Sequence, residues 1–510
     1  MTERFDAIVV GSGAGGGVVA GELAERGRSV LLLEAGPHHS AADHMRLEAR
    51  ANHEIWFPVA FAEPPAPDQP PVPLFRGRCV GGTTTVNTKV AVRPDAEDYS
   101  KWYAAAGLLG RDGEPFAEAD LLPYLERVEQ RLGVRPRTDW QRCVTAVEPG
   151  FEAIGAKLAP VMSYTDPNCM RCGSCMQGCP TNAGKSTLNT YIQPAVVFGG
   201  LELRAGCEVR RVLIEDGAGR PQATGVEYLG PGGDLQQALA DVVVVATGAL
   251  ATPGVLLRSG VREIAGGSPS SRLLGRNLGF HAARLIAGLF DERMDAHMVY
   301  PISSHCKQWQ RDADGGFLVE AATVQDPIGF ATGLCDEQGL PMWGQALVEV
   351  TRRYRHISSL LTMVNDENTG VVWVDEDGRD RYSYGWNERE QQRLDASLDT
   401  ARRILEAAGA KRVLPTGVVS THVQGSCRMG SDPERSVVDA NGESHDVMRL
   451  FVGDSSVIPR TLSVNPSLTI MALASRLAAH IDADERGYLN PGQPPRRHPP
   501  GAYEVRTASV

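Results

Sequence analysis

The first 36 residues constrain the fold of this chain more than any other stretch. Ala7–Val10 is a short apolar run of the kind that forms a buried parallel strand, and it ends at Gly11 in a glycine-rich turn. A helical pattern follows over Ala14–Glu25, and Ser29–Leu33 is a second apolar run. Strand, turn, helix and strand in this order predict a βαβ unit.

Three glycines and one acidic residue indicate what this unit binds. Gly11, Gly13 and Gly16 have G-x-G-x-x-G spacing, and Glu34 lies 18 residues after Gly16. Glycines at this spacing let the backbone approach a pyrophosphate, whose charge then lies at the helix N-terminus. A carboxylate at the end of the second strand can accept hydrogen bonds from the hydroxyls of an adenosine ribose. The unit therefore predicts one dinucleotide site, and no second unit of this kind follows along the chain.

Length and charge limit the classes of protein that the chain can belong to. With 510 residues it exceeds one ordinary hydrophobic core, so two or more domains are expected. The 51 Lys and Arg against 62 Asp and Glu give a net charge of −11, which disfavours nucleic acid or an anionic membrane as a partner. The first strand begins so close to Met1 that we expect no signal peptide, and no apolar run is long enough to span a membrane. We therefore expect a cytoplasmic protein whose ten cysteines form no disulfide framework.

Further motifs follow in order along the chain, and together they resemble the glucose–methanol–choline (GMC) oxidoreductases. Besides the βαβ unit, the resemblance rests on the segments Gly77–Ser100, Gly248–Val261, Gly275–His281, Thr421–Gly430 and Phe451–Thr469. It covers nearly the whole chain, with one departure at Arg262, where glycine is usual in the family. The resemblance implies an α/β fold with a Rossmann-like FAD-binding domain and a second, substrate domain built on an antiparallel sheet.

The same resemblance implies FAD as the dinucleotide, and it assigns residues to the cofactor. The expected FAD-binding residues are Gly11, Gly13, Gly16, Glu34, Gly81, Gly82, Thr83, Asn87, Val209, Asp454, Asn465 and Pro466. Val209 would contact adenine through its backbone, Asp454 would lie by the pyrophosphate, and the Asn465–Pro466 backbone would lie near the flavin pyrimidine edge. Some family members join a histidine covalently to the flavin, but Val86 stands at that position here. We therefore expect non-covalent FAD.

For catalysis the family uses a histidine paired with a histidine or asparagine beside the flavin. His422 matches the first position and Asn465 the second. Oxidising an alcohol to a carbonyl removes a hydroxyl proton and a hydride, and an imidazole can accept the proton. The resemblance therefore implies that His422 is the general base, that Asn465 holds the substrate oxygen, and that hydride passes to flavin N5.

A cluster of four cysteines sets this chain apart. Cys169, Cys172, Cys175 and Cys179 are followed by Pro180 and have the spacing of ferredoxin ligands, which predicts an iron–sulfur cluster. In ferredoxins with two such runs the fourth cysteine serves the other cluster. A three-iron cluster, or a fourth ligand from Cys143 or Cys207, would then be needed. Flavoprotein subunits of some sugar and polyol dehydrogenases that resemble this chain carry a cluster in such an insert, whereas other relatives do not. A zinc site and thiols that only pack a loop are the other interpretations.

The division into domains follows from these motifs and from a change in sequence pattern. Residues 1–283 are expected to form mainly the FAD-binding domain, with the cysteine-rich insert at 168–185. Residues 284–414 carry longer alternating runs, which predict the substrate domain, and 415–485 return to the FAD-binding domain with the catalytic motifs. Residues 486–510 are a Pro-rich tail.

Three functions fit the sequence. The leading one is an FAD-dependent alcohol dehydrogenase that passes electrons to an acceptor other than oxygen, such as a protein or a quinone, with the cluster as a candidate relay. The second is an oxygen-using oxidase that acts on an alcohol such as a sugar or aminoglycoside hydroxyl. The third is a redox-inert relative that keeps FAD as scaffold, which the presence of both His422 and Asn465 argues against.

Overall fold

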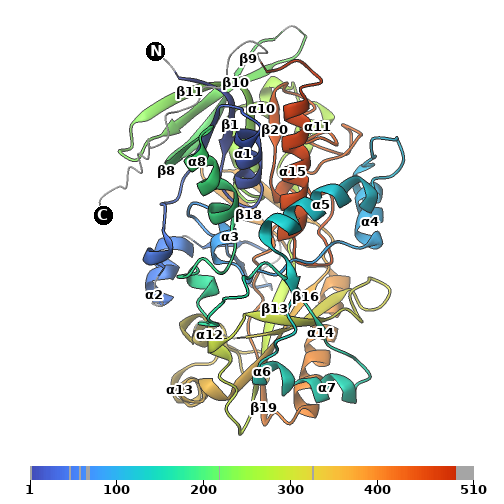
Figure 1. Cartoon of the computed structure of the whole chain (residues 1–510). Helices are drawn as coiled ribbons and strands as arrows, with labels where there is room; N and C mark the ends of the chain where they lie inside the picture. Colours follow the sequence, from blue (N-terminus) through green and yellow to red (C-terminus); the bar gives the residue numbers. More distant parts are fainter. Residues whose placement is uncertain are drawn as a thin grey trace.

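The computed structural model describes residues 3–44, 48–56, 59–64, 69–217, 219–323 and 327–489. Figure 1 shows an elongated molecule with one sheet at its upper end and another at its lower end. Most of the predicted Pro-rich tail, residues 490–510, lies outside the described residues. The two sheets confirm the predicted α/β fold with a second, antiparallel domain.

The upper sheet has seven strands and contains the predicted βαβ unit. Its strands are β1 (Arg4–Val10), β2 (Val30–Glu34), β8 (Leu201–Ala205), β9 (Glu208–Glu215), β10 (Gln222–Leu229), β11 (Leu235–Val245) and β20 (Leu450–Val452). The order is β8-β2-β1-β11-β10-β9, with β20 also paired to β11. β1 is parallel to β2 and β11, whereas β10 is antiparallel to both β11 and β9. The carboxyl ends of the parallel strands therefore meet at one edge of the sheet.

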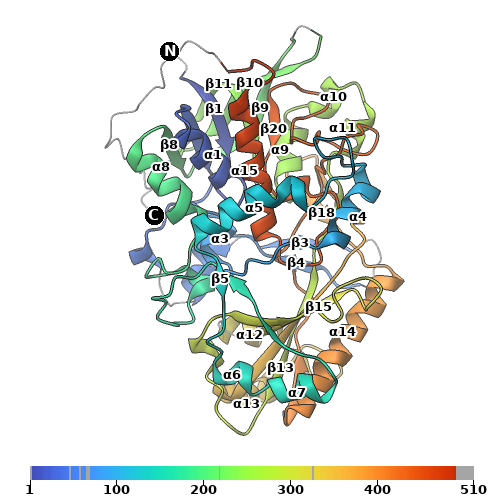
Figure 2. The same ribbon diagram turned by 45° about the vertical axis from the view of Figure 1, so that its right-hand side comes forward.

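Helices from distant parts of the chain cover this sheet. α1 (Gly16–Glu25) packs against α15 (Ser467–Ala483), and α15 packs against α5 (Glu118–Leu132). Figure 2 shows α5 crossing beside α15. α1 and α15 are almost wholly buried, because each has apolar or small residues on nearly every face. The start of the chain and its C-terminal motifs therefore share one core.

The lower sheet has six strands, and all of its pairings are antiparallel. Its order is β19 (Arg412–Pro415), β13 (Ala282–Leu289), β16 (Ile357–Val364), β15 (Phe317–Ala322), β14 (Ile302–Cys306) and β6 (Ala159–Pro160). The helix α14 (Glu388–Ala407) covers one face of this sheet. Its N-cap Asn387 accepts a hydrogen bond from the Glu390 N–H at 3.0 Å, which stabilises the first turn of the helix.

One part of the chain joins the lower sheet from within the first 283 residues. The helices α6 (Arg142–Thr145) and α7 (Glu148–Ala153) share a core with α14, and β6 pairs with the edge strand β14. No sequence pattern predicted that this segment pairs with the lower sheet, because β6 is only two residues long. Residues 142–160 therefore pack with the lower sheet and α14.

The other strands and helices lie outside the two large sheets. The strands are β3 (Ala60–Ala62), β4 (Val72–Leu74), β5 (Arg135–Pro136), β7 (Met162–Ser163), β12 (Arg276–Leu278), β17 (Gly370–Val374) and β18 (Asp380–Ser383). The helices are α2 (Glu48–Ala51), α3 (Thr83–Val86), α4 (Ala96–Ala106), α8 (Gln193–Phe198), α9 (Thr252–Arg258), α10 (Val261–Ile264), α11 (Pro269–Leu273), α12 (Pro327–Gly333) and α13 (Gly344–Arg352). Among the helices of the described residues, none combines the length and apolar character that crossing a membrane requires.

Candidate active site

The glycine loop between β1 and α1 forms an open cradle. A side chain at Gly11 would place its Cβ 2.4 Å from the Ala246 carbonyl oxygen, and one at Gly16 would lie 1.9 Å from the Gly11 oxygen. A Cβ at Gly13 would meet no atom within 4 Å. α1 begins at Gly16 without a side-chain cap. The loop therefore combines close backbone packing with free space in front of a helix N-terminus, which fits a pyrophosphate.

Glu34 is buried at the end of β2 and holds this loop in place. Its carboxylate accepts hydrogen bonds from the Ser12 N–H at 3.0 Å, from the Ser12 Oγ at 2.7 Å and from the Gly36 N–H at 2.8 Å. Burial is the largest effect on this carboxyl and raises the pKa of Glu34. The side chain thus lies beside the cradle, at the position that the sequence predicted for a ribose-binding acid.

The predicted flavin loop packs directly on the dinucleotide loop. The Gly81 N–H donates a hydrogen bond to the Ser12 Oγ at 2.9 Å, and a Cβ at Gly82 would lie 2.8 Å from the Gly13 Cα. Thr83 begins α3, and its Oγ1 accepts a hydrogen bond from the Gly77 N–H at 3.0 Å. The structure therefore brings together loops that are about 70 residues apart in the sequence.

Two polar contacts connect the predicted flavin loop to the C-terminal motif. The Asn87 Nδ2 donates to the Tyr164 hydroxyl at 2.5 Å, and this hydroxyl lies 3.1 Å from the Ser467 Oγ. Ser467 is the first residue of α15, and Pro466 immediately precedes it as the N-cap. The predicted flavin contacts at Asn87 and at Pro466 are therefore joined through one buried tyrosine.

Asp454 and Val209 also lie at this edge of the upper sheet. The Asp454 carboxylate accepts hydrogen bonds from the Gly248 N–H at 2.8 Å and the Thr252 Oγ1 at 2.5 Å. Its neighbour Gly453 packs so closely on the start of α1 that a Cβ at Gly15 would overlap the Gly453 oxygen. Val209 is near the start of β9, just after the Cys207 N–H that donates to the Glu34 carbonyl oxygen at 2.8 Å. Asp454 therefore lies beside the start of α1, and Val209 follows a residue that contacts Glu34.

His422 contacts a second histidine that the sequence analysis did not assign. The His422 Nδ1 lies 3.0 Å from the His281 Nδ1, and the two rings are tilted by 79°. The other ring nitrogen of His281, Nε2, bonds to the Leu462 carbonyl oxygen. His281 ends the Gly275–His281 segment, which the sequence showed only as a family motif. The signal that could have identified it is a histidine at the end of a motif that the family resemblance had already singled out.

The hydrogen bonds of this pair fix the positions of the protons. A backbone carbonyl can only accept, so the His281 Nε2 carries a hydrogen, and burial lowers the pKa of His281 to about 4. Neutral His281 then presents an unprotonated Nδ1, which accepts the hydrogen on the His422 Nδ1. Burial lowers the pKa of His422 to about 3, so this imidazole is also neutral. The His422 Nε2 is therefore left with a free lone pair.

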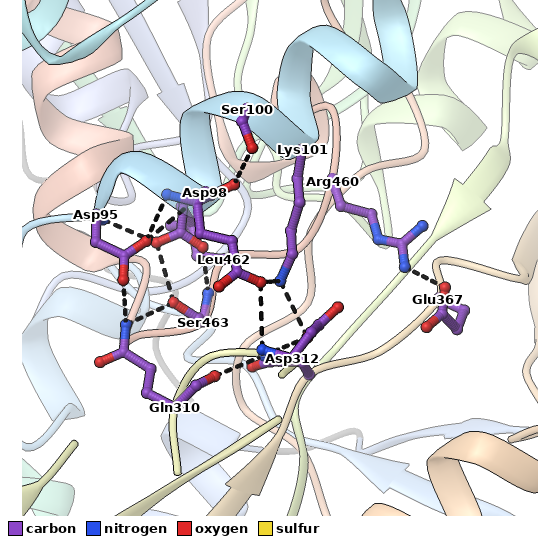
Figure 3. A network of polar contacts seen from close by, with 12 residues as sticks. Asp95, Asp98, Ser100, Lys101, Gln310, Asp312, Glu367, Arg460, Leu462 and Ser463 are labelled. Atoms are coloured by element: carbon purple, nitrogen blue, oxygen red, sulfur yellow. Dashed lines mark hydrogen bonds and ion pairs between the residues drawn. The ribbon is translucent and has the colours of Figure 1, made fainter. Parts of the chain in front are cut away.

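Hydrogen bonds to both domains hold the segment that carries Asn465. The Asp98 carboxylate on α4 accepts from the Ser463 N–H at 2.8 Å and from the Ser463 Oγ at 3.0 Å. The Gln310 Nε2 of the substrate domain donates to the same Ser463 Oγ at 2.7 Å, and Figure 3 shows this junction. A few residues away, the Lys101 Nζ lies 3.1 Å from an Asp312 carboxylate oxygen. The chain just before Asn465 is thus clamped between α4 and a substrate-domain loop.

His281 and Gln424 join this segment to the His422 loop. His281 contacts both His422 and the Leu462 carbonyl, and the Gln424 Oε1 accepts from the Leu462 N–H at 3.2 Å. Asn465 itself is buried, and its Oδ1 has no hydrogen-bond partner among the described residues. The structure therefore brings together the two segments that carry the predicted catalytic pair.

The four clustered cysteines line one hollow but do not form a metal site. Cys169, Cys172, Cys175 and Cys179 share this hollow with other residues that include Arg171 and Tyr300. Across the described residues, no group of three or more His, Cys, Asp or Glu side chains is arranged to hold a metal ion. The iron–sulfur and zinc predictions therefore receive no support from the structure.

The two proposed extra ligands are also placed elsewhere. Cys143 is buried in the core of the substrate domain, beneath α14, and Cys207 is buried in the core of the FAD-binding domain. Neither lines the hollow of the four cysteines. Instead, the buried Lys89 ammonium lies close enough to Cys175 and Cys179 to interact with them electrostatically. The idea of a ligand from Cys143 or Cys207 thus fails because each lies in a separate core.

Comparison with known proteins agrees with this arrangement. Residues 5–283 and 367–474 match two family models, each described as GMC oxidoreductase. A GMC-type oxidoreductase of Mycobacterium tuberculosis is 31% identical over 503 residues, which cover 93% of this chain and 75% of the relative. A long-chain-alcohol oxidase of Arabidopsis thaliana is 26% identical over 537 residues, covering 94% of this chain and 69% of the relative.

Among solved structures, pyridoxine 4-oxidase from Mesorbium loti has the same fold. Its TM-score is 0.71 at 20% identity, and the match covers 93% of this chain and 98% of that one. The ordered motifs, the two sheets and the matched family models all lead to the same assignment. The chain belongs to the GMC oxidoreductase family.

Proposed function

We propose that this protein oxidises an alcohol to a carbonyl compound, with FAD as cofactor and His422 as the general base. The observation that carries the proposal is the contact between His281 and His422, because it leaves a lone pair on the His422 Nε2. A buried, neutral imidazole with a free nitrogen can accept a hydroxyl proton. The family assignment and the names of the relatives, which include a long-chain-alcohol oxidase and a pyridoxine 4-oxidase, support alcohol as the substrate class.

The residues around the cradle fit FAD. The loop at Gly13 and the N-terminus of α1 would hold the pyrophosphate, and Glu34 would bind the ribose hydroxyls. The Gly81–Asn87 loop and the start of α15 would hold the flavin, whose chemistry when bound is to accept the hydride. Val86 is apolar and fully buried, so we propose non-covalent binding.

The protein side chains would then handle the proton. The His422 Nε2 takes the hydroxyl proton of the substrate, and the Asn465 amide holds the substrate oxygen. A second proton makes His422 a cation, which costs free energy in a buried site. The neutral His281 Nδ1 offsets part of this cost, because it continues to accept the His422 Nδ1 hydrogen in the charged state. His281 is therefore a positioning residue.

The electron acceptor separates a dehydrogenase from an oxidase. The sequence favoured an acceptor other than oxygen because the four cysteines suggested an electron relay. The described residues include no group arranged to hold a metal ion, so the structure does not support this relay. The long-chain-alcohol oxidase and the pyridoxine 4-oxidase that this chain resembles are both named as oxidases. We therefore propose oxygen as the acceptor, and keep a protein or quinone acceptor as the second candidate.

One experiment tests both halves of the reaction. The holoenzyme is mixed anaerobically with a panel of primary alcohols, polyols and sugars, and flavin absorbance is followed before and after air is admitted. We expect bleaching by at least one alcohol and rapid recovery in air. The alcohol proposal fails if the flavin is never bleached, and the oxidase proposal fails if bleaching persists in air until a quinone is added.

A further inference from the structure

The hollow lined by the four clustered cysteines has no part in the proton transfer described above. These four cysteines are free thiols and partly exposed, whereas every other cysteine of the chain is buried. The Cys175 thiol lies close enough to Cys169, Cys172 and Cys179 to interact with each of them electrostatically. The fold therefore gathers four thiols at one accessible place, without a set of metal ligands among the described residues.

Cys179 has the surroundings of a reactive thiol. The Gly184 N–H donates to the Cys179 Sγ at 3.2 Å, and the Thr181 Oγ1 lies 3.6 Å from the same sulfur. Burial raises the pKa of Cys179, but these hydrogen bonds and the nearby Lys89 ammonium outweigh burial, so the pKa lies below its ordinary value. Burial dominates at Cys175 and raises its pKa to about 12. Donors and a cation around a sulfur stabilise the thiolate, which is the form that reacts with oxidants.

The Lys89 side chain connects Cys179 to the predicted flavin loop. Its buried ammonium donates to the carbonyl oxygens of Thr84 and Thr85 on α3, the second at 3.2 Å. Burial lowers the pKa of Lys89 to about 8, and Cys179 is among the thiols that raise it. A Cβ at Gly184 would lie 2.9 Å from the Lys89 Cε, so the loop that donates to Cys179 also packs on this lysine. A change of charge at Cys179 therefore acts on a group that holds α3.

We propose that Cys179 is a peroxide-reactive thiol that forms a reversible disulfide with a second cysteine of the hollow, and that this disulfide weakens FAD binding. The Cys179 thiolate attacks one oxygen of hydrogen peroxide, so that an S–O bond forms, the O–O bond breaks and hydroxide leaves. A second thiol of the hollow then attacks the Cys179 sulfur. The S–S bond forms, the S–O bond breaks, and the oxygen leaves as water with the proton of that thiol. The two sulfurs together lose two electrons, which reduce the peroxide.

The disulfide removes the negative charge of Cys179 beside Lys89. The buried ammonium then keeps its proton less readily, because burial is opposed by fewer anionic neighbours. A neutral amine donates more weakly to the Thr84 and Thr85 carbonyl oxygens, so the flavin loop is held less firmly.

The oxidase reaction proposed above supplies the peroxide, because oxygen that accepts two electrons and two protons becomes hydrogen peroxide. This source rests on the proposed function, whereas the disulfide does not. An enzyme of this kind loses cofactor affinity as its own by-product accumulates.

Added peroxide tests the disulfide on the resting holoenzyme. Free thiols are counted before and after treatment with hydrogen peroxide, and unreduced peptides are mapped by mass spectrometry. We expect one pair of thiols to be lost, a disulfide that includes Cys179, and recovery of both thiols in dithiothreitol. Cys179→Ser should form no disulfide at the same dose, and Cys335→Ser, which removes a buried cysteine after α12, should respond as the wild type does.

Three results of this experiment would overturn the proposal. They are an unchanged thiol count in the treated wild type, a disulfide that leaves Cys179 free, and iron or zinc bound by these cysteines in the untreated protein.

FAD affinity gives the second readout. Flavin fluorescence measures the FAD released when the holoenzyme is diluted. Peroxide should weaken FAD binding by the wild type about 10-fold, the effect of weakening a hydrogen bond to a charged group, and dithiothreitol should restore it. Cys179→Ser also lacks the thiolate, so it should bind FAD as weakly as the oxidised wild type, with or without peroxide. Equal FAD affinity of the reduced and oxidised wild type would refute the link through Lys89.

Turnover separates this inference from the proposed function. During alcohol oxidation in air, the disulfide should accumulate in the wild type, and catalase should prevent it. If added peroxide forms the disulfide but turnover in air never does, the proposed oxygen acceptor fails and the reactive thiol stands.

Discussion

At the residue scale, the proposed proton transfer depends on the pairing of the buried His281 with the half-buried His422. His281 is tied to a backbone carbonyl, which determines which of its nitrogens can face His422. The backbone therefore sets the proton positions of both rings. The His422 Nε2, which we propose takes the substrate proton, is free because the Nδ1 hydrogen has a partner that accepts.

Replacing His422 by alanine should stop proton removal without displacing the cofactor. We expect flavin reduction by substrate to fall by roughly two to four orders of magnitude, the range for a general base, while bound FAD remains. Stopped-flow absorbance measures the first effect and the flavin-to-protein ratio the second. His356→Ala, on a short helix of the substrate domain, is the matched control. Near wild-type reduction in His422→Ala would refute the assignment.

His281 should be replaceable only by a side chain that offers both a donor and an acceptor. His281→Leu removes the acceptor for the His422 Nδ1 hydrogen, so the rate of flavin reduction should fall about 10–100-fold, as for other supporting hydrogen bonds. His281→Gln retains both functions and should recover part of that rate. Pre-steady-state reduction rates at equal FAD content make the comparison. An equal rate in the two variants would indicate that His281 only fills space.

At the element scale, α4 and a substrate-domain loop hold the catalytic segment. Ser463 accepts a hydrogen bond from Gln310 and donates two to Asp98, so two domains fix one short stretch of chain (Figure 3). Burial raises the pKa of Asp98 to about 6, yet the Ser463 and Asp95 N–H groups favour its charged form. The geometry at Asn465 therefore depends on a helix more than 350 residues earlier.

Asp98→Asn should loosen this segment. Asparagine has one acceptor oxygen where the carboxylate has two, so at least one hydrogen bond from Ser463 or Asp95 is lost. We expect a loss of about 1–3 kcal/mol in the free energy of unfolding, and slower flavin reduction, because Asn465 moves. Urea unfolding and stopped-flow reduction measure the two effects. The exposed Asp399→Asn on α14 should change neither, and full stability of Asp98→Asn would count against the clamp.

At the scale of the whole molecule, the site exists only where two domains meet. The FAD-binding domain supplies His422, Asn465 and the glycine loops. His281 directly precedes β13 of the lower sheet, and Glu320 lies on β15 of the same sheet. Stability and activity are therefore linked, because groups buried at this junction must be neutral or paired when the protein is folded.

Acid should destabilise the protein through its buried histidines. The pKa values of His281 and His422 are about 4 and about 3 in the folded protein, below the ordinary value of 6.5. The unfolded chain therefore binds more protons than the folded one between these values, so the free energy of unfolding falls as pH drops below 6.5. By pH 5 the loss should be on the order of 2 kcal/mol per histidine.

Urea midpoints of the holoenzyme at pH 7 and pH 5 measure this loss. The double variant His281→Gln/His422→Gln cannot take up these protons, so its midpoint should shift less between the two pH values. His356→Gln serves as the control and should shift as the wild type does. An unchanged pH dependence in the double variant would show that neither histidine is held neutral by burial.

Local sequence patterns determined the elements and the order of the motifs. The apolar runs and glycines of Phe5–Gly36 predicted the βαβ unit because strand and helix periods are properties of neighbouring residues. The G-x-G-x-x-G spacing and Glu34 predicted the cradle for the same reason, since turn, helix N-terminus and strand end are all local. The family resemblance then placed His422 and Asn465 in motifs that the structure brings together.

Only the tertiary structure decided which side chains meet. His281 joins His422, Glu320 reaches Asn465, and residues 142–160 cross into the lower sheet through packing between distant segments. The cysteine spacing suggested a metal site, yet the fold gives these thiols a shared hollow without a ligand set among the described residues. The spacing of cysteines along a chain limits how close their sulfur atoms can come to one another. The directions in which the cysteine side chains point depend on the surrounding backbone. The sequence alone therefore predicted the cofactor loop, whereas the tautomer of His422 and the contact of Glu320 with Asn465 required the folded molecule.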